Sequence, residues 1–187
     1  MTPKLDAVST RGGDIHPDQR VGIFIDVGNL YHSAKNLHNG RVNYRELIKH
    51  LVAGRHLIRS MAYVVKSDSA AGESAFFEAL QSAGLELRVK ELQVYGDGLK
   101  KGDWDVGMAV DAIRMASFLD VVILVTGDGD FLPLVDYLKW GMGRLVEVAA
   151  FHRSASSRMQ EVADRFVSIE RIPRAIMKIR SRINHQE

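Results

Sequence analysis

The sequence predicts an α/β fold with three layers, in which a mostly parallel central sheet of about five or six strands lies between helices. Apolar strand-like runs and helical patterns alternate at least four times, which is typical of a parallel sheet with helical crossovers. In addition, the run VVILV at residues 121–125 has no polar residue, as expected of a strand that is covered on both faces. Together these two observations indicate the fold class.

The expected elements follow one another in a regular order. Apolar runs predict strands at residues 21–25, 56–66, 85–95, 121–125 and 144–151. Helical spacing and capping signals predict helices at residues 30–37, 69–83, 131–140 and 155–165, and two more that begin near Asn43 and Asp105. The strand at 85–95 alternates apolar and polar residues, so we expect it near an edge of the sheet.

The chain divides into a single domain with two short extensions. Residues 1–20 mix Thr, Pro, Gly and Asp without periodicity and predict a flexible N-terminal extension, followed by a domain at 21–170. Residues 171–187 form a basic tail, in which cations interleaved with isoleucines favour an amphipathic helix. The tail is interpreted as a solvated helix, an arm that holds RNA or a partner, or a segment that docks on the domain or forms a homodimer.

The composition excludes several classes of protein. The chain has no cysteine, which excludes disulfides, thiolate metal sites and thiol nucleophiles and favours a reducing, cytoplasmic setting. Its seven histidines show no paired ligand spacing, so a zinc site is not expected. No apolar run reaches the roughly 20 residues that span a bilayer, and there is no signal-peptide core, so no membrane role is predicted. The net charge of +2 permits nucleic acid as a partner without requiring it.

Acidic residues occur where the predicted strands and helices meet. Asp26 follows the first strand, Asp128 and Asp130 follow the strand at 121–125, and Asp105 begins a helix. The carboxyl ends of parallel strands share one edge of a sheet, so these four carboxylates are expected to converge there. Crowded carboxylates need a compensating cation, and hard oxygen ligands suit Mg²⁺ or Mn²⁺. Such ions support phosphodiester cleavage.

A purely structural interpretation competes with this one. An Asp that follows a strand often forms only an Asx-turn or a helix N-cap, and this applies to Asp130 and Asp105 taken singly. Asp26 is harder to explain in this way, because its strand is strongly apolar and a buried carboxylate without a partner is costly.

Three motifs resemble those of the NYN domain, in particular its bacterial LabA-like branch. They are Asp26-Val-Gly-Asn29, Lys101-Gly-Asp-Trp-Asp105-Val with Asp111 six residues on, and Thr126-Gly-Asp128-Gly-Asp130-Phe131. The likeness covers about residues 21–169. It implies a PIN-like, Rossmann-like fold, a metal-binding acidic cluster and metal-dependent ribonuclease activity.

The resemblance also implies roles for particular residues. It implies Asp26, Asp105, Asp128 and Asp130 as metal-binding or water-activating acids, and Asn29 as a polar contact to water or substrate. Asp103 is an alternative to Asp105, although the spacing to Asp111 favours Asp105. Because Asp111 lies about 240° around the helix from Asp105, it is interpreted as supporting or structural.

Basic and aromatic residues near the expected edge are candidates for contacts with RNA. Those that would hold substrate phosphates are Lys100, Lys101, His152, Arg153 and Arg158. The alternative for Lys100 and Lys101 is a solvated loop. Tyr31 and Trp104 could stack on unpaired bases, with core packing as the favoured alternative for Trp104.

The sequence therefore predicts a metal-dependent endoribonuclease, with RNA as substrate and Mg²⁺ or Mn²⁺ as cofactor. The second hypothesis is a non-catalytic module that binds RNA or has a regulatory role. A haloacid-dehalogenase-type phosphatase is the third and weakest, because that chemistry needs an acid two residues past the first Asp, where this chain has Gly28.

Overall fold

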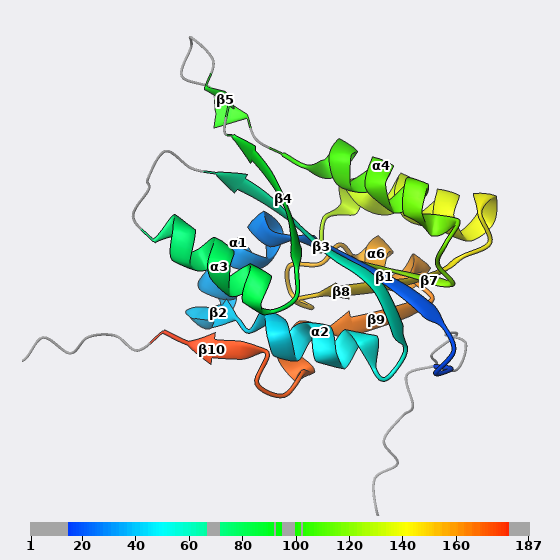
Figure 1. Cartoon of the computed structure of the whole chain (residues 1–187), viewed down its shortest axis with the longest axis horizontal. Helices are drawn as coiled ribbons and strands as arrows, with labels where there is room; N and C mark the ends of the chain where they lie inside the picture. Colours follow the sequence, from blue (N-terminus) through cyan, green and yellow to red (C-terminus); the bar gives the residue numbers. More distant parts are fainter. Residues whose placement is uncertain (1–14, 67–71, 92, 95–99, 102, 180–187) are drawn as a thin grey trace, which may run out of the picture.

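A six-stranded sheet lies at the centre of the protein (Figure 1). The computed structural model describes residues 15–66, 72–91, 93–94, 100–101 and 103–179. All neighbouring strands of this sheet pair in parallel, so the predicted α/β fold is confirmed. In spatial order the strands are β4 (Glu86–Glu91), β3 (His56–Lys66), β1 (Arg20–Asp26), β7 (Val121–Val125), β8 (Leu145–Ala150) and β9 (Arg165–Ser168).

The two central strands are β1 and β7, which are separated by almost 100 residues in the chain. Their register places Ile25 beside Val125, so that Asp26 and Thr126 leave the sheet at the same edge. Both strands are apolar because both faces of the sheet are covered, and every residue of β7 is buried. The half-exposed β4 forms one edge of the sheet, as predicted.

Helices cover both faces of the sheet. Helices α1 (Val27–His38), α2 (Tyr44–Val52) and α3 (Glu73–Ser82) pack with Ile23 and Ile25 in one core. Helices α4 (Asp105–Ala116), α5 (Leu132–Asp136) and α6 (Ser157–Val162) pack with Phe24 in the other. Alternate residues of β1 thus serve opposite faces, which is the period of a strand. Within the described residues, no helix is both long enough and apolar enough to cross a bilayer.

Two expected helices differ from the structure. The helix expected at 131–140 is a composite of η1 (Gly129–Phe131), α5 and the π-helical η2 (Tyr137–Gly141). The helix expected at 155–165 is shorter, and β9 follows it as the sixth strand. Four residues are too few to show a clear period, and β9 exists because it pairs with β8.

The described part of the basic tail is not the expected amphipathic helix. After η3 (Ile169–Arg171), the chain forms β10 (Ile176–Lys178), which pairs antiparallel with β2 (Gly40–Val42). Pro173 has no backbone N–H and disfavours helix for the residue before it. Ile172 is buried in the core, so docking on the domain covers part of the apolar surface of the tail, whereas Met177 and Ile179 stay exposed.

Short pairings complete the fold. The strand expected at 85–95 is divided into β4 and β5 (Gln93–Val94), and β5 pairs antiparallel with β6 (Lys100–Lys101), where a loop was expected. Of the predicted N-terminal extension, residues 1–14 lie outside the described residues, and β1 begins at Arg20.

Candidate metal centre

Asp26 links the end of β1 to the start of α1. Its Oδ1 atom accepts a hydrogen bond from the backbone N–H of Asn29 at 3.0 Å, so Asp26 is the N-cap of the helix. The helix dipole favours a negative charge at this position. The hydroxyl of Thr126 donates to the other carboxylate oxygen, Oδ2, at 3.4 Å. Asp26 is thereby held at the junction of the two central strands.

The turn after β7 is held by its own side chains. Asp128 accepts a hydrogen bond from the backbone N–H of Asp130 at 3.0 Å and caps η1, while its own N–H donates to Thr126 Oγ1 at 3.2 Å. The N–H of Gly127 donates to Asn29 Oδ1 at 3.1 Å. These bonds fix the two acids of the turn relative to the start of α1.

The glycines of this turn allow a close approach by the loop between β8 and α6. A Cβ atom at Gly127 would lie 2.9 Å from the Cα atom of Ala155, and one at Gly129 would lie 3.3 Å from Ser156 Oγ. The backbone N–H of Ser156 also donates to the Gly127 carbonyl at 2.9 Å. A side chain at residue 127 would therefore push the two segments apart.

Three carboxylates from two separate segments converge at this edge of the sheet. Asp105, the first residue of α4, joins Asp128 and Asp130, and each offers an oxygen within 4.8 Å of the other two. Asp105 and Asp128 are half-buried and Asp130 is exposed. This closest group does not include Asp26, which lies near enough for its charge to influence the pKa of Asp105.

Burial and the crowding of acids raise the pKa values of two of them. Burial raises the pKa of the Asp26 carboxyl, the hydrogen bonds from Asn29 and Thr126 oppose that rise, and the charge of Asp128 adds to it. Burial is also the largest cause of the raised pKa of Asp105, and the charges of neighbouring acids add to it. Those neighbours are Asp103, Asp26, Asp128 and Asp130. A cation placed among them would relieve this repulsion.

Asp111 lies outside this group. Its Oδ2 atom accepts a hydrogen bond from the Tyr63 hydroxyl at 3.1 Å and lies 3.4 Å from Arg88 Nε. Asp111 therefore has its own partners on β3 and β4, in agreement with a supporting role. Asp103 is exposed, and its backbone carbonyl accepts a hydrogen bond from Lys90.

Trp104 packs in the core, which was its favoured interpretation. Its Nε1–H donates to the Val64 carbonyl at 2.9 Å, and its ring meets the Tyr63 ring edge to face. A Cβ atom at Gly107 would lie only 2.5 Å from the Trp104 ring. The glycine in the first turns of α4 thus makes room for the indole.

The candidate phosphate ligands differ in their positions. His152 and Arg153 are exposed on the loop after β8, and Arg158 is exposed in the first turn of α6, close in the chain to the residues that contact Gly127. The His152 backbone N–H donates to the Glu170 carboxylate, which fixes the start of this loop. The side chains of Lys100 and Lys101 lie outside the described residues.

Sequence reasoning missed two residues beside the acids. Thr126 bridges Asp26 and the Asp128 backbone; it stands in the third motif at the end of a buried strand, but no role was assigned to it. Tyr44 is buried, and burial together with the charge of Asp26 raises its pKa. No local pattern could place Tyr44 there, because it comes from α2.

Fold and site together define a PIN-like α/β domain with an acidic cluster at the carboxyl edge of its sheet. The family model described as "NYN domain" matches residues 20–170. The chain is 23% identical over 168 residues to the "Low amplitude and bright protein LabA" of Synechococcus elongatus (strain ATCC 33912 / PCC 7942 / FACHB-805), covering 85% of this chain and 88% of that protein.

A solved structure has the same fold. The crystal structure of a protein of unknown function, VPA0982 from Vibrio parahaemolyticus RIMD 2210633, superposes with a TM-score of 0.79 and 29% identity. The match covers 88% of this chain and all of the other. The chain therefore belongs to the NYN domain family and is LabA-like.

Proposed function

We propose that this protein is a metal-dependent endoribonuclease that hydrolyses RNA phosphodiester bonds at the acidic cluster, with Mg²⁺ or Mn²⁺ as cofactor. The observation that carries the proposal is the convergence of Asp105, Asp128 and Asp130 to within 4.8 Å. Folding does not favour such a group of like charges, so its presence fits a functional demand.

The residues at the site fit a hard divalent cation. All the donors are carboxylate oxygens, which Mg²⁺ and Mn²⁺ prefer to nitrogen or sulfur. In the described part of the chain, none of the ion pairs involves Asp26, Asp105, Asp128 or Asp130. Among these described residues, no Lys, Arg or His balances their charge, and a metal ion would supply the balance.

Each acid has a distinct part in this proposal. Asp105, Asp128 and Asp130 would hold the ion, which when bound polarises the phosphate and increases the acidity of water. Asp26, with its raised pKa and its fixed carboxylate, would add charge to the metal site and orient the attacking water. Asn29 positions the turn through Gly127 and leaves its amide NH₂ group for a polar contact.

The open position of the site supports cleavage within a strand. Asp130 is exposed, and with Asp105 it lines a cleft of about 320 Å³ between α4 and α5. An RNA strand could cross such a cleft without placing one of its ends in the site. Membership of the NYN family supports RNA as the substrate, and His152, Arg153 and Arg158 would contact its phosphates.

Turnover of RNA by the full-length protein tests the proposal. A circular single-stranded RNA and the same RNA with a labelled 5′ end are incubated with Mn²⁺, with Mg²⁺ and with EDTA. We expect cleavage of both RNAs with either metal and none in EDTA. Cleavage of the linear RNA alone would contradict endonucleolytic action.

Two matched variants exclude a contaminating nuclease. Asp128→Asn removes one carboxylate of the cluster, and Asp136→Asn removes an exposed carboxylate of α5 outside it. We expect Asp128→Asn to lose at least 100-fold in rate, as when an electrostatic group of an active site is removed, and Asp136→Asn to keep wild-type activity. Equal rates for Asp128→Asn and the wild type would sink the assignment and favour the non-catalytic module.

A further inference from the structure

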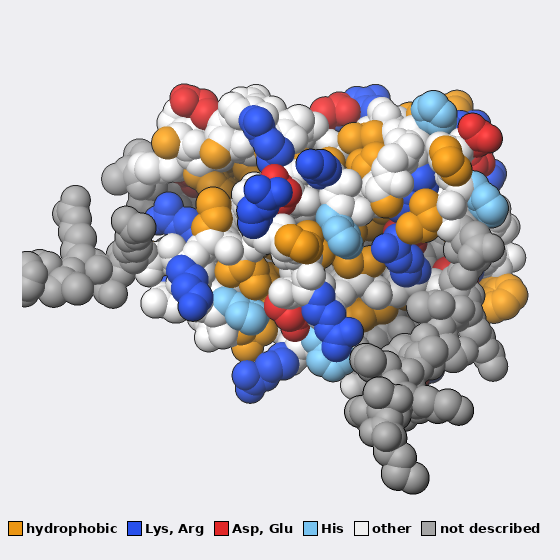
Figure 2. Space-filling model, turned by 90° about the horizontal axis from the view of Figure 1, so that it is seen from below, with side chains coloured by type: hydrophobic (Ala, Val, Ile, Leu, Met, Phe, Trp, Pro, Cys, Tyr) orange, Lys and Arg blue, Asp and Glu red, His pale blue; other side chains and the backbone are white. Residues whose placement is uncertain are grey.

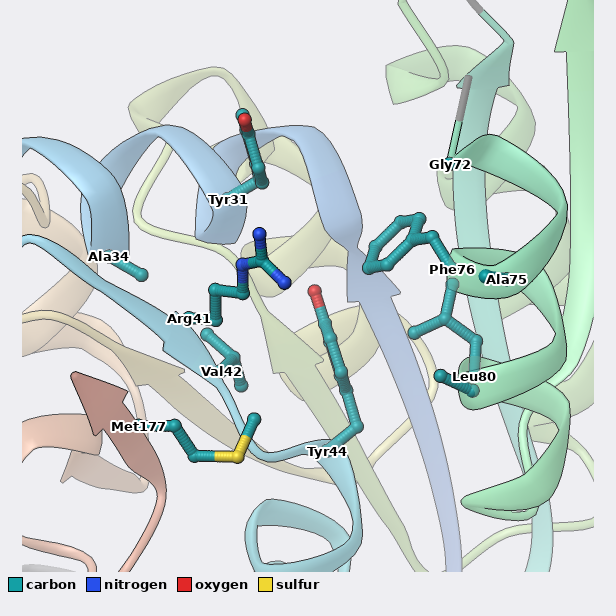
Figure 3. A pocket seen from close by; sticks show the side chains of 11 residues that line it. Tyr31, Ala34, Arg41, Val42, Tyr44, Gly72, Ala75, Phe76, Leu80 and Met177 are labelled. Carbon is teal, nitrogen blue, oxygen red and sulfur yellow. The ribbon is translucent and has the colours of Figure 1, made fainter. Parts of the chain in front are cut away.

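A second cavity of about 560 Å³ lies on the face of the sheet covered by α1 and α3 (Figure 3). Its walls come from five elements, α1, β2, α2, α3 and β10. Three aromatic rings line it, those of Tyr31, Tyr44 and Phe76, and the Tyr44 and Phe76 rings meet edge to face at 6.4 Å. A cavity of this size and lining suits a planar ligand.

The cavity also contains the Arg41 side chain, for which the described residues provide no acidic partner. In Figure 3 the Arg41 guanidinium lies between the side chains of Tyr31 and Tyr44 and points into the cavity. Among the residues that the structure describes, no carboxylate forms an ion pair with it. An unpaired guanidinium beside aromatic rings is suited to an anion that carries a planar group.

The cavity lies near Asp26, the acid at the end of β1. Tyr44 lies near enough to Asp26 for that carboxylate to influence it electrostatically. Tyr31 follows Asp26 by five residues along the start of α1, a rise of roughly 7.5 Å along the helix axis at 1.5 Å per residue. A nucleotide in the cavity would therefore be close to one whose phosphate lies at the acids.

A basic face continues from the cavity. Figure 2 shows more Lys and Arg side chains than acids on the face that carries α2, β2 and β10. The exposed cations of these and the adjoining elements are Lys35, Arg41, Arg45, Lys49, Arg171, Arg174 and Lys178. Two acids of the same elements are engaged, Glu46 by Arg174 and Glu170 by the backbone of His152. This face would attract a polyanion.

From these observations we infer that the cavity binds one unstacked nucleotide of single-stranded RNA, with its base among Tyr31, Tyr44 and Phe76 and its phosphate at Arg41. The inference rests on the proposed function for the choice of RNA as the polyanion. Single-stranded RNA is commonly gripped by bases stacked on aromatic side chains and by phosphates paired with cations. The rest of the strand would follow the basic face.

Binding without turnover tests this inference separately from the nuclease proposal. The full chain is titrated into a fluorescent eight-nucleotide RNA in EDTA, and its affinity is measured by anisotropy at several salt concentrations. We expect Tyr31→Leu and Arg41→Gln each to weaken binding roughly 5-fold or more, as for the loss of one stacked base or one charged contact. Because Arg41 contacts a phosphate, Arg41→Gln should also lower the slope of log K against log salt by about 0.7, whereas Tyr31→Leu should not.

Matched controls lie at the other end of the sheet. Phe118→Leu and Arg114→Gln change an exposed aromatic residue and an exposed cation at the C-terminal end of α4 and just beyond it. The inference is supported if they bind as the wild type does while the two cavity variants do not, at unchanged melting temperature. Equal binding by all four variants, or no binding of RNA by the wild type, would overturn it.

A competition experiment distinguishes RNA from a free nucleotide as the ligand of the cavity. If the cavity serves an RNA strand, a mononucleotide should compete with the labelled RNA only at concentrations at least 100-fold higher than unlabelled RNA. Tight binding of the mononucleotide alone would overturn the assignment to RNA. A wild-type protein that binds RNA but does not cleave it with either metal would contradict the nuclease proposal and leave this inference standing.

Discussion

The side-chain oxygen of Asn29 accepts a hydrogen bond from the backbone N–H of Gly127 at 3.1 Å. This bond joins the first turn of α1 to the turn that carries Asp128 and Asp130. Asp26 is the N-cap of the same helix, so one amide side chain fixes the relative positions of acids that are about 100 residues apart in the chain. The Thr126 hydroxyl, which donates to Asp26, adds a second link between the same two segments.

Replacing Asn29 by Ala should therefore impair both stability and activity. The Gly127 N–H is buried and would lose its acceptor, which costs about 1–3 kcal/mol. For a chain of this length, we expect the melting temperature to fall by roughly 2–10 °C, with a loss of RNA cleavage. Asn36→Ala, at an exposed position of the same helix, is the control. An unchanged melting temperature of Asn29→Ala would show that this hydrogen bond contributes little to stability.

Metal binding should stabilise the protein in a pH-dependent manner. In the metal-free fold, the pKa of the Asp105 carboxyl is raised above its ordinary value of 3.8. As pH rises, the unfolded chain therefore loses this proton first. The stability that the group contributes then falls above about pH 4. A metal ion competes with that proton. The increase in melting temperature with Mn²⁺ should thus be larger at pH 7 than at pH 5.

Asp105→Asn separates this effect from unspecific binding of ions. At pH 7 the variant should melt a few degrees higher than the wild type in EDTA, because one of the crowded charges is gone. It should also lose most of the stabilisation by Mn²⁺. For the wild type this stabilisation is about 2.7 kcal/mol in the free energy of unfolding when the Mn²⁺ concentration is 100 times Kd. Differential scanning fluorimetry measures both, and an unchanged response to Mn²⁺ would exclude Asp105 as a ligand.

A buried ion pair far from the acids should dominate the electrostatic stability. The Arg55 and Glu147 side chains are almost fully buried and form two hydrogen bonds, of 2.7 and 3.1 Å. Glu147→Gln would leave Arg55 without its carboxylate and should cost roughly 3–5 kcal/mol. Glu86→Gln, which breaks the exposed pair with Arg59, should cost less than about 1 kcal/mol. Urea denaturation of both variants compares them, and equal costs would contradict the difference in burial.

Trp104→Phe should reduce stability without affecting RNA binding. The variant retains an aromatic ring beside Tyr63 but loses the hydrogen bond to the Val64 carbonyl and some buried area. We expect a loss of about 1–3 kcal/mol in the free energy of unfolding. Weaker binding of RNA in EDTA at unchanged stability would instead favour base stacking by this residue.

The docked tail should contribute to the core. Ile172 is 5% exposed and packs in the same core as α1 and α2, so Ile172→Ala should cost about 2–5 kcal/mol. Met177, on β10, is 48% exposed, and Met177→Ala should have a small effect on unfolding. Similar losses for the two variants would mean that the tail is less closely packed than the structure indicates.

Local sequence patterns predicted much of the fold. The apolar runs that end at Asp26 and Asp128 identified the central strands, because a strand buried on both faces has no polar alternation. Asn43, near which a helix was predicted to begin, accepts a hydrogen bond from the Glu46 N–H and caps α2. Such signals depend only on neighbouring residues, so they can be recognised without the tertiary structure.

Short elements stabilised by distant partners could not be predicted in this way. Strands β9 and β10 have four and three residues, and each is defined by pairing with another strand. The cations of the tail are interleaved with isoleucines, from which an amphipathic helix was expected, but Ile176–Lys178 pairs with β2 instead. Intrinsic propensity is a weak signal where tertiary contacts decide.

The sequence by itself determined the family, the parallel sheet and the acids that end its strands and begin α4. Only the tertiary structure decided which acids meet, because Asp105 approaches Asp128 and Asp130 through the packing of α4 on the sheet, while Asp111 is turned toward Tyr63 and Arg88. The same holds for the cavity around Arg41, whose walls come from five elements. Spacing along one chain fixes the face of a helix or strand, but the distance between two elements depends on how both pack on a third.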